Sequence, residues 1–440
     1  MPSSSPDQRL SQIEGSVAVA RTVARCRPSV IAAYPISPQT HIVEGLSDLV
    51  RAGELTDCEY LMAESEFGAM SACIGASAAG VRTYTATSSQ GLLFMAEALF
   101  NASGLGLPIV MTVANRAIGA PINIWNDHSD SMSMRDSGWI QLYAESNQAA
   151  VDLHIQAFAL AERLSVPVMV CMDGFVLTHA VEEVELPEQV QVDAFLPRFV
   201  PQQFLDPKEP VSIGAMVGPE AFTEVKYLMH AKQVQALDEI PRLAADFEEM
   251  FGRPGGGLVA PYRTDDAETI VVTLGSVLGA VEEVVDELRD DGVRIGALGI
   301  TCFRPWPLDE VRAALAGASR VIVVEKAFAV GAGGIVGQNI RLALSGLPAT
   351  VYDIVAGLGG RPVTRASLRG LFRDVLDDRM DSRELHFLDL DIELVERELA
   401  RTRLGGTGPH AEHMLRALVG VGAVPPVPGA PGTTSDEAAD

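Results

Sequence analysis

The chain has 440 residues, with 33 Lys and Arg against 58 Asp and Glu, so its formal net charge is −25. Such an acidic surface is a poor partner for nucleic acid and for anionic membranes. Its hydrophobic content of 48% permits large buried cores and argues against global disorder. No apolar run approaches about 18 residues, so we expect no transmembrane helix. Residues 1–10 are polar and lack a signal-peptide core, which favours a cytoplasmic protein.

The cysteines argue against a metal site built by this chain alone. Their number is odd, and no two of them form a C-x-x-C pair, which disfavours a disulfide framework, a zinc site and an iron–sulfur site. The five are Cys26, Cys58, Cys73, Cys171 and Cys302. Any redox metal that works with this chain must therefore come from another polypeptide.

Residues 15–200 alternate short apolar segments with helical ones, which predicts a doubly wound parallel α/β sheet. The expected strands are Val30–Tyr34, Glu59–Ala63, Arg82–Ala86, Pro108–Val113, Gly138–Tyr143 and Val166–Met172. The expected helices are Gln39–Arg51, Phe67–Ala79, Gln90–Ser103 and Gln148–Leu164. The strand over 108–113 is almost uniformly apolar, as in a strand buried on both faces.

A connector, a long helix and a second α/β unit follow. Residues 197–219 are rich in proline and polar side chains, 221–251 form a charged helical stretch, and 253–257 are a linker. The second unit is expected to have strands Thr269–Thr273, Val293–Leu298, Ser319–Val324 and Thr350–Val355, and helices Val277–Arg289, Leu308–Ala316 and Gly337–Leu344. We therefore expect a flexible segment over 1–14, domains over 15–252 and 258–400, and a disordered tail over 401–440.

Polar groups at the ends of the predicted strands are the strongest pointers to chemistry. The carboxyl ends of parallel strands face the ligand crevice, so the Ser37 hydroxyl and the Glu66 carboxylate are aimed at one site. Ser37-Pro38 also fits a helix start, with Ser37 as N-cap. Capping alone is thus the alternative for Ser37, and a solvated loop carboxylate is the alternative for Glu64 or Glu66.

Two further strand ends carry candidate groups. Thr85–Gly91 combines hydroxyls with a glycine, although N-capping explains much of this pattern. Arg116 follows the apolar strand, where an arginine suits a small carboxylate ligand; an internal salt bridge is the alternative. Asn126–Asp130 resembles a polar site or a metal site, but it lacks a second histidine at ligand spacing and favours a loop or cap. Gly331–Gly334 could hold an anion, but helix–sheet packing is the favoured interpretation.

Two nucleotide fingerprints and one cofactor element are missing from the sequence. There is no Walker A motif and no strand-linked G-x-G-x-x-G with a following acid. There is also no Gly-Asp-Gly element followed by Asn ligands, which thiamine diphosphate enzymes use to hold magnesium pyrophosphate.

With these residues in view, the chain resembles the alpha subunit of multi-subunit 2-oxoacid:ferredoxin oxidoreductases, above all those acting on pyruvate. The resemblance covers about residues 15–375 in the family's order. It rests on the motifs Tyr34–Thr40, Glu64–Glu66, Ala76–Gly80, Thr85–Gly91, Ala114–Ala117, Pro121–Ser131, Met172–Phe175, Phe303–Pro307 and Gly357–Arg361.

The resemblance implies a pyrimidine-binding thiamine diphosphate domain followed by a domain similar to the transketolase C-terminal domain. In the family the pyrophosphate site, with its Mg²⁺, lies in the beta subunit, and [4Fe-4S] clusters lie in the beta and delta subunits. A gamma subunit normally completes the assembly, which is expected to be a dimer of heteromers. Ferredoxin or flavodoxin takes the electrons, and coenzyme A is a co-substrate. No metal site is expected in this chain.

The resemblance also implies roles for individual residues. Glu66 matches the glutamate that bonds N1′ of the aminopyrimidine and favours its imino tautomer, which removes the C2 proton of the thiazolium. Arg116 matches the arginine that binds the 2-oxoacid carboxylate. Ser37 matches a substrate-contacting threonine, so here the hydroxyl is kept and the methyl lost. Further cofactor contacts are expected from Pro35, Ser89 and Gln90.

The implied activity is the oxidative decarboxylation of pyruvate or a related 2-oxoacid, with coenzyme A, to acyl-CoA, CO2 and reduced ferredoxin, in either direction. This chain alone should not catalyse it. Two alternatives stay open: a beta-type chain of a lipoyl-linked 2-oxoacid dehydrogenase, and a non-catalytic scaffold of the same fold. The motifs at Tyr34–Pro38 and Ala114–Ala117 argue against the first, and Glu66 and Arg116 argue against the second.

Overall fold

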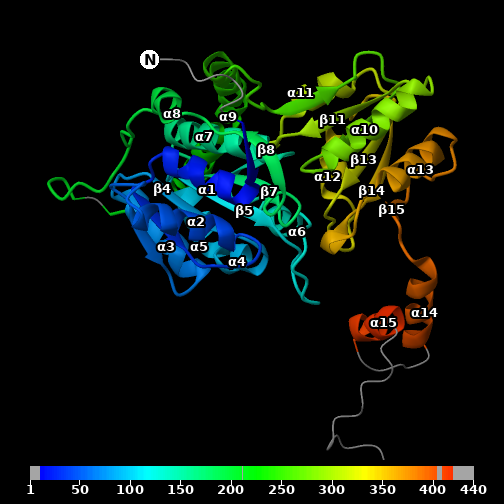
Figure 1. The fold of residues 1–440 in the computed structure, drawn as a ribbon, viewed down its shortest axis with the longest axis horizontal. Helices are drawn as coiled ribbons and strands as arrows, with labels where there is room; N and C mark the ends of the chain where they lie inside the picture. The colour runs from blue at the N-terminus through cyan, green and yellow to red at the C-terminus, as the bar shows by residue number, and fades with distance from the viewer. Residues whose placement is uncertain (1–9, 211, 404–408, 420–440) are drawn as a thin grey trace, which may run out of the picture. The chain divides into compact units, whose positions relative to one another are not determined.

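The structure of the protein is a computed structural model, which describes residues 10–210, 212–403 and 409–419. Contacts divide the chain into two compact units, Met1–Leu388 and Asp389–Asp440. Figure 1 shows the two α/β halves of the first unit, blue to green and yellow-green to orange. The second unit contains two helices that pack on each other, α14 (Ile392–Arg403) and α15 (His410–Val419).

A seven-stranded sheet forms the centre of the first α/β half. Its strand order is β12-β6-β7-β5-β4-β2-β3, and every pairing is parallel except that of β12 with β6. The strands are β2 (Val30–Ala33), β3 (Glu59–Met62), β4 (Thr83–Thr87), β5 (Ile109–Asn115), β6 (Ile140–Tyr143), β7 (Val168–Asp173) and β12 (Cys302–Arg304). The predicted doubly wound parallel sheet is confirmed.

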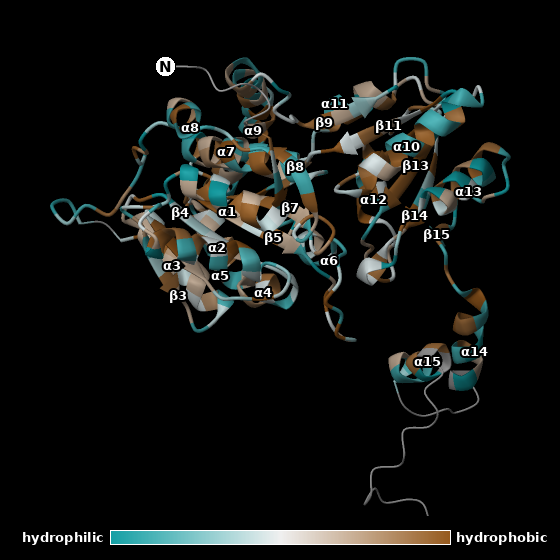
Figure 2. Ribbon diagram, viewed as in Figure 1, coloured by the Kyte–Doolittle hydropathy of each residue, from teal (hydrophilic) through white to brown (hydrophobic). Residues whose placement is uncertain are grey.

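Helices cover both faces of this sheet, because successive strand side chains point to opposite sides. Ile31 and Ala33 of β2 face one core, whereas Ala32 faces the other. The first core includes α1 (Gly15–Arg25), α2 (Thr40–Arg51), α7 (Asn147–Leu164), α8 (Gln189–Phe195) and the C-terminal part of α9 (Phe222–Phe251). The second includes α3 (Glu66–Ala78), α4 (Ser89–Phe94) and α5 (Ala96–Gly104). Figure 2 shows the resulting pattern, with hydrophobic strands inside and hydrophilic residues on the outer helices.

The second α/β half contains a six-stranded sheet in the order β15-β14-β13-β10-β11-β9, parallel except for β9. Its strands are β9 (Val259–Tyr262), β10 (Thr269–Thr273), β11 (Ile295–Ile300), β13 (Arg320–Glu325), β14 (Thr350–Val355) and β15 (Leu385–Phe387). Its helices are α10 (Val277–Asp290), α11 (Leu308–Leu315), α12 (Ile335–Ala343) and α13 (Arg365–Leu376).

The two halves are interlocked by β12. After β11 the chain leaves the second sheet, adds Cys302–Arg304 to the edge of the first sheet beside β6, and returns through α11. One hydrophobic core also includes residues from both halves, such as Met111 of β5 and Val272 of β10. The predicted domain over 258–400 thus gives one of its strands to the other sheet.

The predicted ends of the chain need correction. Leu10–Glu14 is a strand, β1, which pairs antiparallel with β8 (Val181–Glu185), so the expected flexible segment over 1–14 is wrong for these residues. The expected disordered tail over 401–440 is wrong for 401–403, which end α14, and for α15, while residues 404–408 and 420–440 lie outside the described part. Within the described ranges, no helix combines the length and the apolar character needed to cross a bilayer.

Candidate active site

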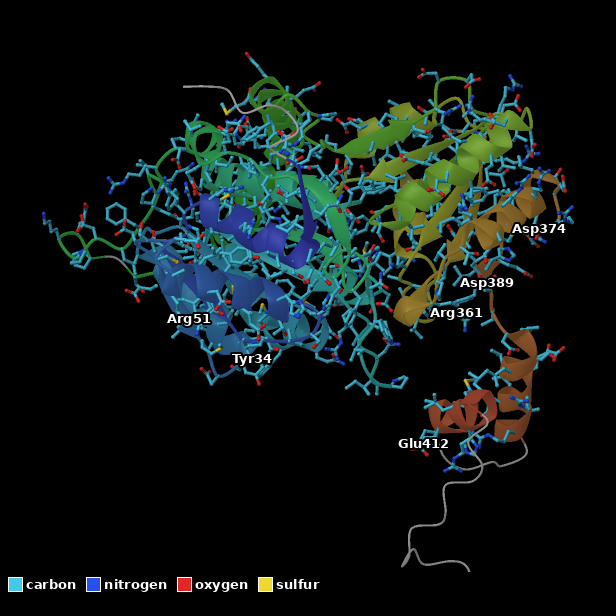
Figure 3. All side chains as sticks on the ribbon, viewed as in Figure 1. Tyr34, Arg51, Arg361, Asp374, Asp389 and Glu412 are labelled. Atoms are coloured by element: carbon cyan, nitrogen blue, oxygen red, sulfur yellow. The ribbon has the colours of Figure 1, made fainter. Side chains whose placement is uncertain are left out.

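The candidate residues lie at the carboxyl ends of β2, β3, β4 and β5. Chain order reverses between the neighbouring strands β2 and β4, because β3 lies on one side of β2 and β4 on the other. Open α/β sheets bind ligands outside the strand ends at such a switch point. Tyr34, labelled in Figure 3, lies on the loop that follows β2 at this edge.

Glu66 is a buried carboxylate without a partner in the described chain. It is the first residue of α3, whose N-cap Ser65 accepts a hydrogen bond from the Gly68 N–H at 3.1 Å. Glu66 is 7% exposed, and among the described residues no hydrogen bond or ion pair reaches its carboxylate. The carboxylate is therefore available to a partner from outside this chain. Glu64 is exposed, so the solvated alternative holds for that carboxylate alone.

Gly91 provides the space next to Glu66. A Cβ at this glycine would lie 2.6 Å from Glu66 Oε1 and 2.6 Å from Thr87 Oγ1. The first turn of α4 therefore approaches the carboxylate at a distance that only glycine permits. The motif Thr85–Gly91 thus forms one wall beside Glu66.

We expect Gly91→Ala to impair the function of this site while the chain still folds. Gly91 has ordinary helical geometry and alanine favours helices, so the added methyl acts by displacing its close neighbours, the Glu66 carboxylate and the Thr87 hydroxyl. Activity of the assembled enzyme should fall at least about tenfold, since small misplacements of reacting groups are this costly. Gly104→Ala, in α5 with open space around it, is the matched control. Equal activity of the two variants would contradict this account of Gly91.

Arg116 is a buried cation held by carbonyl groups. Its Nε donates to Asn123 O at 3.0 Å and its Nη1 to Ser37 O at 2.9 Å. It is 7% exposed, and no carboxylate among the described residues forms an ion pair with it, so the salt-bridge alternative is wrong. Burial lowers the pKa of Arg116, and the nearby Asp130 charge opposes this. The guanidinium is oriented but its charge is not paired, which suits a carboxylate ligand.

Ser37 is brought next to Arg116, but it is not a helix cap. The helix α2 starts at Thr40 with Gln39 as N-cap, and no side-chain capping bond is present. The Ser37 side chain is exposed, while its carbonyl accepts the Arg116 bond. The predicted capping role is therefore wrong, and the hydroxyl is left accessible to a ligand. Gln39 instead joins the loop to β4 by donating to Tyr34 O and Ala86 O.

The other predicted cofactor contacts surround this group. Pro35 is half-buried on the loop after β2, and Gln90 is half-buried at the start of α4, where its amide packs against Gly119. Ser89 is fully buried, and its hydroxyl donates to Ala117 O at 2.6 Å. The Ser89 hydroxyl could donate to a ligand only if it gave up its hydrogen bond to Ala117 O.

The loop after Arg116 connects the site to the second α/β half. Asn123 Nδ2 donates to Gly359 O at 3.1 Å, and the Gly359 N–H donates to Asp127 Oδ2 at 3.0 Å. Asn123 O is also an acceptor for Arg116, so the Gly357–Arg361 motif supports the loop that orients the guanidinium. The interpretation of Asn126–Asp130 as a loop structure is confirmed for Asp127, which also accepts the Ser129 N–H.

A buried ionic cluster joins the two halves, and the sequence analysis missed it. Asp173, at the end of β7, contacts His128 Nε2 at 2.8 Å and Lys326 Nζ at 3.2 Å, and it accepts the Ser276 N–H at 2.8 Å. Its pKa is well below the usual range, because the Lys326 and His128 contacts outweigh burial. Its position at a strand end was the available signal, but Lys326 lies 153 residues away in sequence.

The glycine-rich loop of the second half is filled by the chain itself. Glu325 accepts the N–H groups of Ile335, Val336 and Gly337 at 2.8, 2.9 and 3.1 Å, at the start of α12. Burial raises the pKa of Glu325 to about 7. The free N–H groups at the start of α12 are therefore already bonded to a side chain of the chain itself.

Comparisons with known proteins agree with this fold. Residues 21–244 match the family model described as pyruvate flavodoxin/ferredoxin oxidoreductase, thiamine diphosphate-binding. Residues 267–368 match pyruvate:ferredoxin oxidoreductase core domain II. A solved 2-oxoglutarate:ferredoxin oxidoreductase from Magnetococcus marinus has a similar fold, with a TM-score of 0.65 and 20% identity over 83% of this chain and 65% of that one.

Sequence relatives are closer. Pyruvate synthase subunit PorA of Methanosarcina barkeri is 46% identical over 88% of this chain and 98% of its own length. The Pyrococcus horikoshii PorA subunit is 44% identical over 87% and 98%. Ketoisovalerate oxidoreductase subunit VorA of Pyrococcus abyssi is 38% identical over 82% and 92%. The chain belongs to this PorA family of oxidoreductase subunits, which confirms the resemblance seen in the sequence.

Proposed function

We propose that this chain is the alpha subunit of a thiamine diphosphate-dependent 2-oxoacid:ferredoxin oxidoreductase acting on pyruvate. The reaction is oxidative decarboxylation with coenzyme A, and it can run in both directions. The buried and unpartnered Glu66 carboxylate carries this proposal, because such a group fits the N1′ nitrogen of the cofactor's aminopyrimidine. The relatives named as pyruvate synthase subunits support pyruvate over a branched 2-oxoacid.

In this proposal some residues of the chain bind the cofactor and others bind the substrate. Glu66 binds the aminopyrimidine and holds a proton at N1′, and Pro35, Ser89 and Gln90 complete the pyrimidine side. Arg116 binds the substrate carboxylate, and the exposed Ser37 hydroxyl faces the same substrate. The cofactor, when bound, supplies the carbanion chemistry that these side chains cannot perform.

The remaining parts of the enzyme belong to partner chains in this proposal. A beta subunit supplies the pyrophosphate site with Mg²⁺ and a [4Fe-4S] cluster, and gamma and delta subunits complete a dimer of heteromers. Ferredoxin or flavodoxin accepts the electrons, and the assembly is cytoplasmic. The absence of a Gly-Asp-Gly element and of paired cysteines from the sequence supports this division.

Purification of the tagged chain from its own cells tests the proposal. We expect a copurifying chain with a Gly-Asp-Gly element, a brown iron–sulfur chromophore, and ferredoxin reduction that needs both pyruvate and coenzyme A. The chain alone should be inactive. Lipoyl-dependent reduction of NAD would instead support the dehydrogenase alternative, and an inactive assembly without thiamine diphosphate would support the scaffold alternative.

A further inference from the structure

Asp130 is a fully buried carboxylate that accepts four hydrogen bonds from neutral donors. Its Oδ2 accepts the N–H groups of Ser89 and Arg116, both at 2.9 Å. Its Oδ1 accepts Asn115 Nδ2 at 2.8 Å and the Ser131 N–H at 2.7 Å. Asp130 is 0% exposed, and no cation in the described chain forms an ion pair with it. A buried charge held in this way is unusual, because buried carboxylates normally pair with a cation.

The four donors join three separate elements. Ser89 opens α4 after β4, Asn115 ends β5 and Arg116 follows it, and Ser131 belongs to α6 (Ser129–Ser133). One carboxylate therefore fixes both of the strand ends that carry the candidate groups Gln90 and Arg116. It also holds a strained turn, since Ser89 has a φ of +50°, which a residue other than glycine keeps only when its surroundings impose it.

We infer that Asp130 is a positioning residue for Arg116, the side chain proposed to bind the substrate carboxylate. It fixes the Arg116 backbone by accepting a hydrogen bond from its N–H group. Its charge also stabilises the charged form of the buried guanidinium without forming an ion pair with it. A carboxylate paired directly with the guanidinium would compete with the substrate, whereas this arrangement leaves the guanidinium charge for the ligand. The inference rests on the proposed function, because it assigns Arg116 to a 2-oxoacid carboxylate.

The charge of Asp130 is available at neutral pH. Burial raises the pKa of Asp130 to about 6, and the hydrogen bonds from Asn115, Ser89, Arg116 and Ser131 oppose that rise. The carboxylate is therefore mostly ionised above pH 6, where all four donors can be satisfied. Its charge in turn opposes the effect of burial on Arg116.

Asparagine cannot replace Asp130 at this position, although it has the same shape. Each Asp130 oxygen faces two N–H donors, so either orientation of the amide in Asp130→Asn would point its NH2 group at two donors. Two of the four bonds would be lost and the charge near Arg116 would disappear. The Arg116 and Ser89 backbones would then move from their present positions.

Steady-state kinetics of the assembled enzyme with Asp130→Asn test the inference. We expect the KM for the 2-oxoacid to rise about tenfold or more, with little change in the KM for coenzyme A. Asp152→Asn is the matched control. Asp152, on α7, is also a buried carboxylate, but it pairs with Arg253 at 2.7 Å and bonds to none of the candidate site residues. It should reduce thermal stability and leave both KM values unchanged.

Asn115→Ala provides a milder second variant. It removes the Nδ2 bonds to Asp130 Oδ1 and Ser131 Oγ and keeps the Asp130 charge, and the Asn115 Oδ1 that it also removes is buried without a partner. We expect a smaller rise in the 2-oxoacid KM, about threefold, in an enzyme that assembles normally. This variant decides the question if Asp130→Asn does not assemble.

The outcomes separate this inference from the proposed function. If Arg116→Ala raises the 2-oxoacid KM but neither Asp130→Asn nor Asn115→Ala does, Asp130 is not a positioning residue and the function stands. Equal KM effects from Asp152→Asn would show general destabilisation and would also overturn the inference. If Arg116→Ala leaves the KM for the 2-oxoacid unchanged, the proposed role of Arg116 is wrong, and the inference about Asp130 falls with it.

Discussion

Glu66→Gln should abolish turnover in the assembled enzyme while the subunits remain associated. Glutamine keeps the shape of the side chain and its fit against Gly91, but it cannot hold and release a proton at N1′ of the cofactor. General acid–base groups contribute about 10²–10⁴-fold to rates, so we expect a loss in that range or beyond. Pyruvate-dependent reduction of ferredoxin measures the effect, and size-exclusion chromatography checks the assembly.

Glu64→Gln is the matched control for this experiment. Glu64 lies two residues away and is exposed, so the same chemical change there should leave the rate within a factor of two or so of the unmodified enzyme. Near-normal turnover of Glu66→Gln would sink the assignment of Glu66 and would favour the scaffold alternative.

Arg116→Ala should raise the KM for the 2-oxoacid far more than the KM for coenzyme A. A charge-assisted contact is worth about 1.5–3 kcal/mol, which corresponds to an increase of roughly tenfold to a hundredfold. Arg116→Lys should give an intermediate value: lysine keeps the charge, but one ammonium group does not reproduce the fork that reaches both Ser37 O and Asn123 O.

Arg135→Ala controls for the loss of an arginine in the same region. The Arg135 side chain is half-exposed, its Nη1 donates to Met132 O and its Nε lies 3.8 Å from Asp136, so its removal should change neither KM. Equal increases in the KM for the 2-oxoacid and the KM for coenzyme A in Arg116→Ala would argue against binding of the substrate carboxylate by Arg116. They would instead indicate a general distortion of the loop over 117–128.

The central strands were predictable because their sequences are almost uniformly apolar. The strand expected over Pro108–Val113 is present as β5, and every residue of β5 is buried. The strands β1 and β8 were missed, since Leu10–Glu14 and Val181–Glu185 are polar or charged at most positions and become strands only by pairing with each other. The strand β12 has three residues, too few for a periodic signal.

The residues of the site were predictable from the sequence, but the hydrogen bonds that hold them in place were not. Position at a strand end identified Glu66, Arg116 and Ser37 from sequence alone, and a resemblance to a known family added their roles. Local rules failed at Ser37, where a Ser-Pro pair resembles a helix start but Gln39 occupies the cap. The burial of Asp130 was not predictable, because its partners Ser89 and Arg116 lie 41 and 14 residues away.

The crossing strand β12 limits how this protein can be dissected. A fragment cut at the linker over 253–257 would lose Cys302–Arg304, and the edge of β6 would be left with open hydrogen-bonding groups and apolar side chains such as Leu142. Open sheet edges of this kind promote aggregation. The two α/β halves are thus not interchangeable modules, and a recombinant or chimaeric version must carry the first half together with the chain through Arg304.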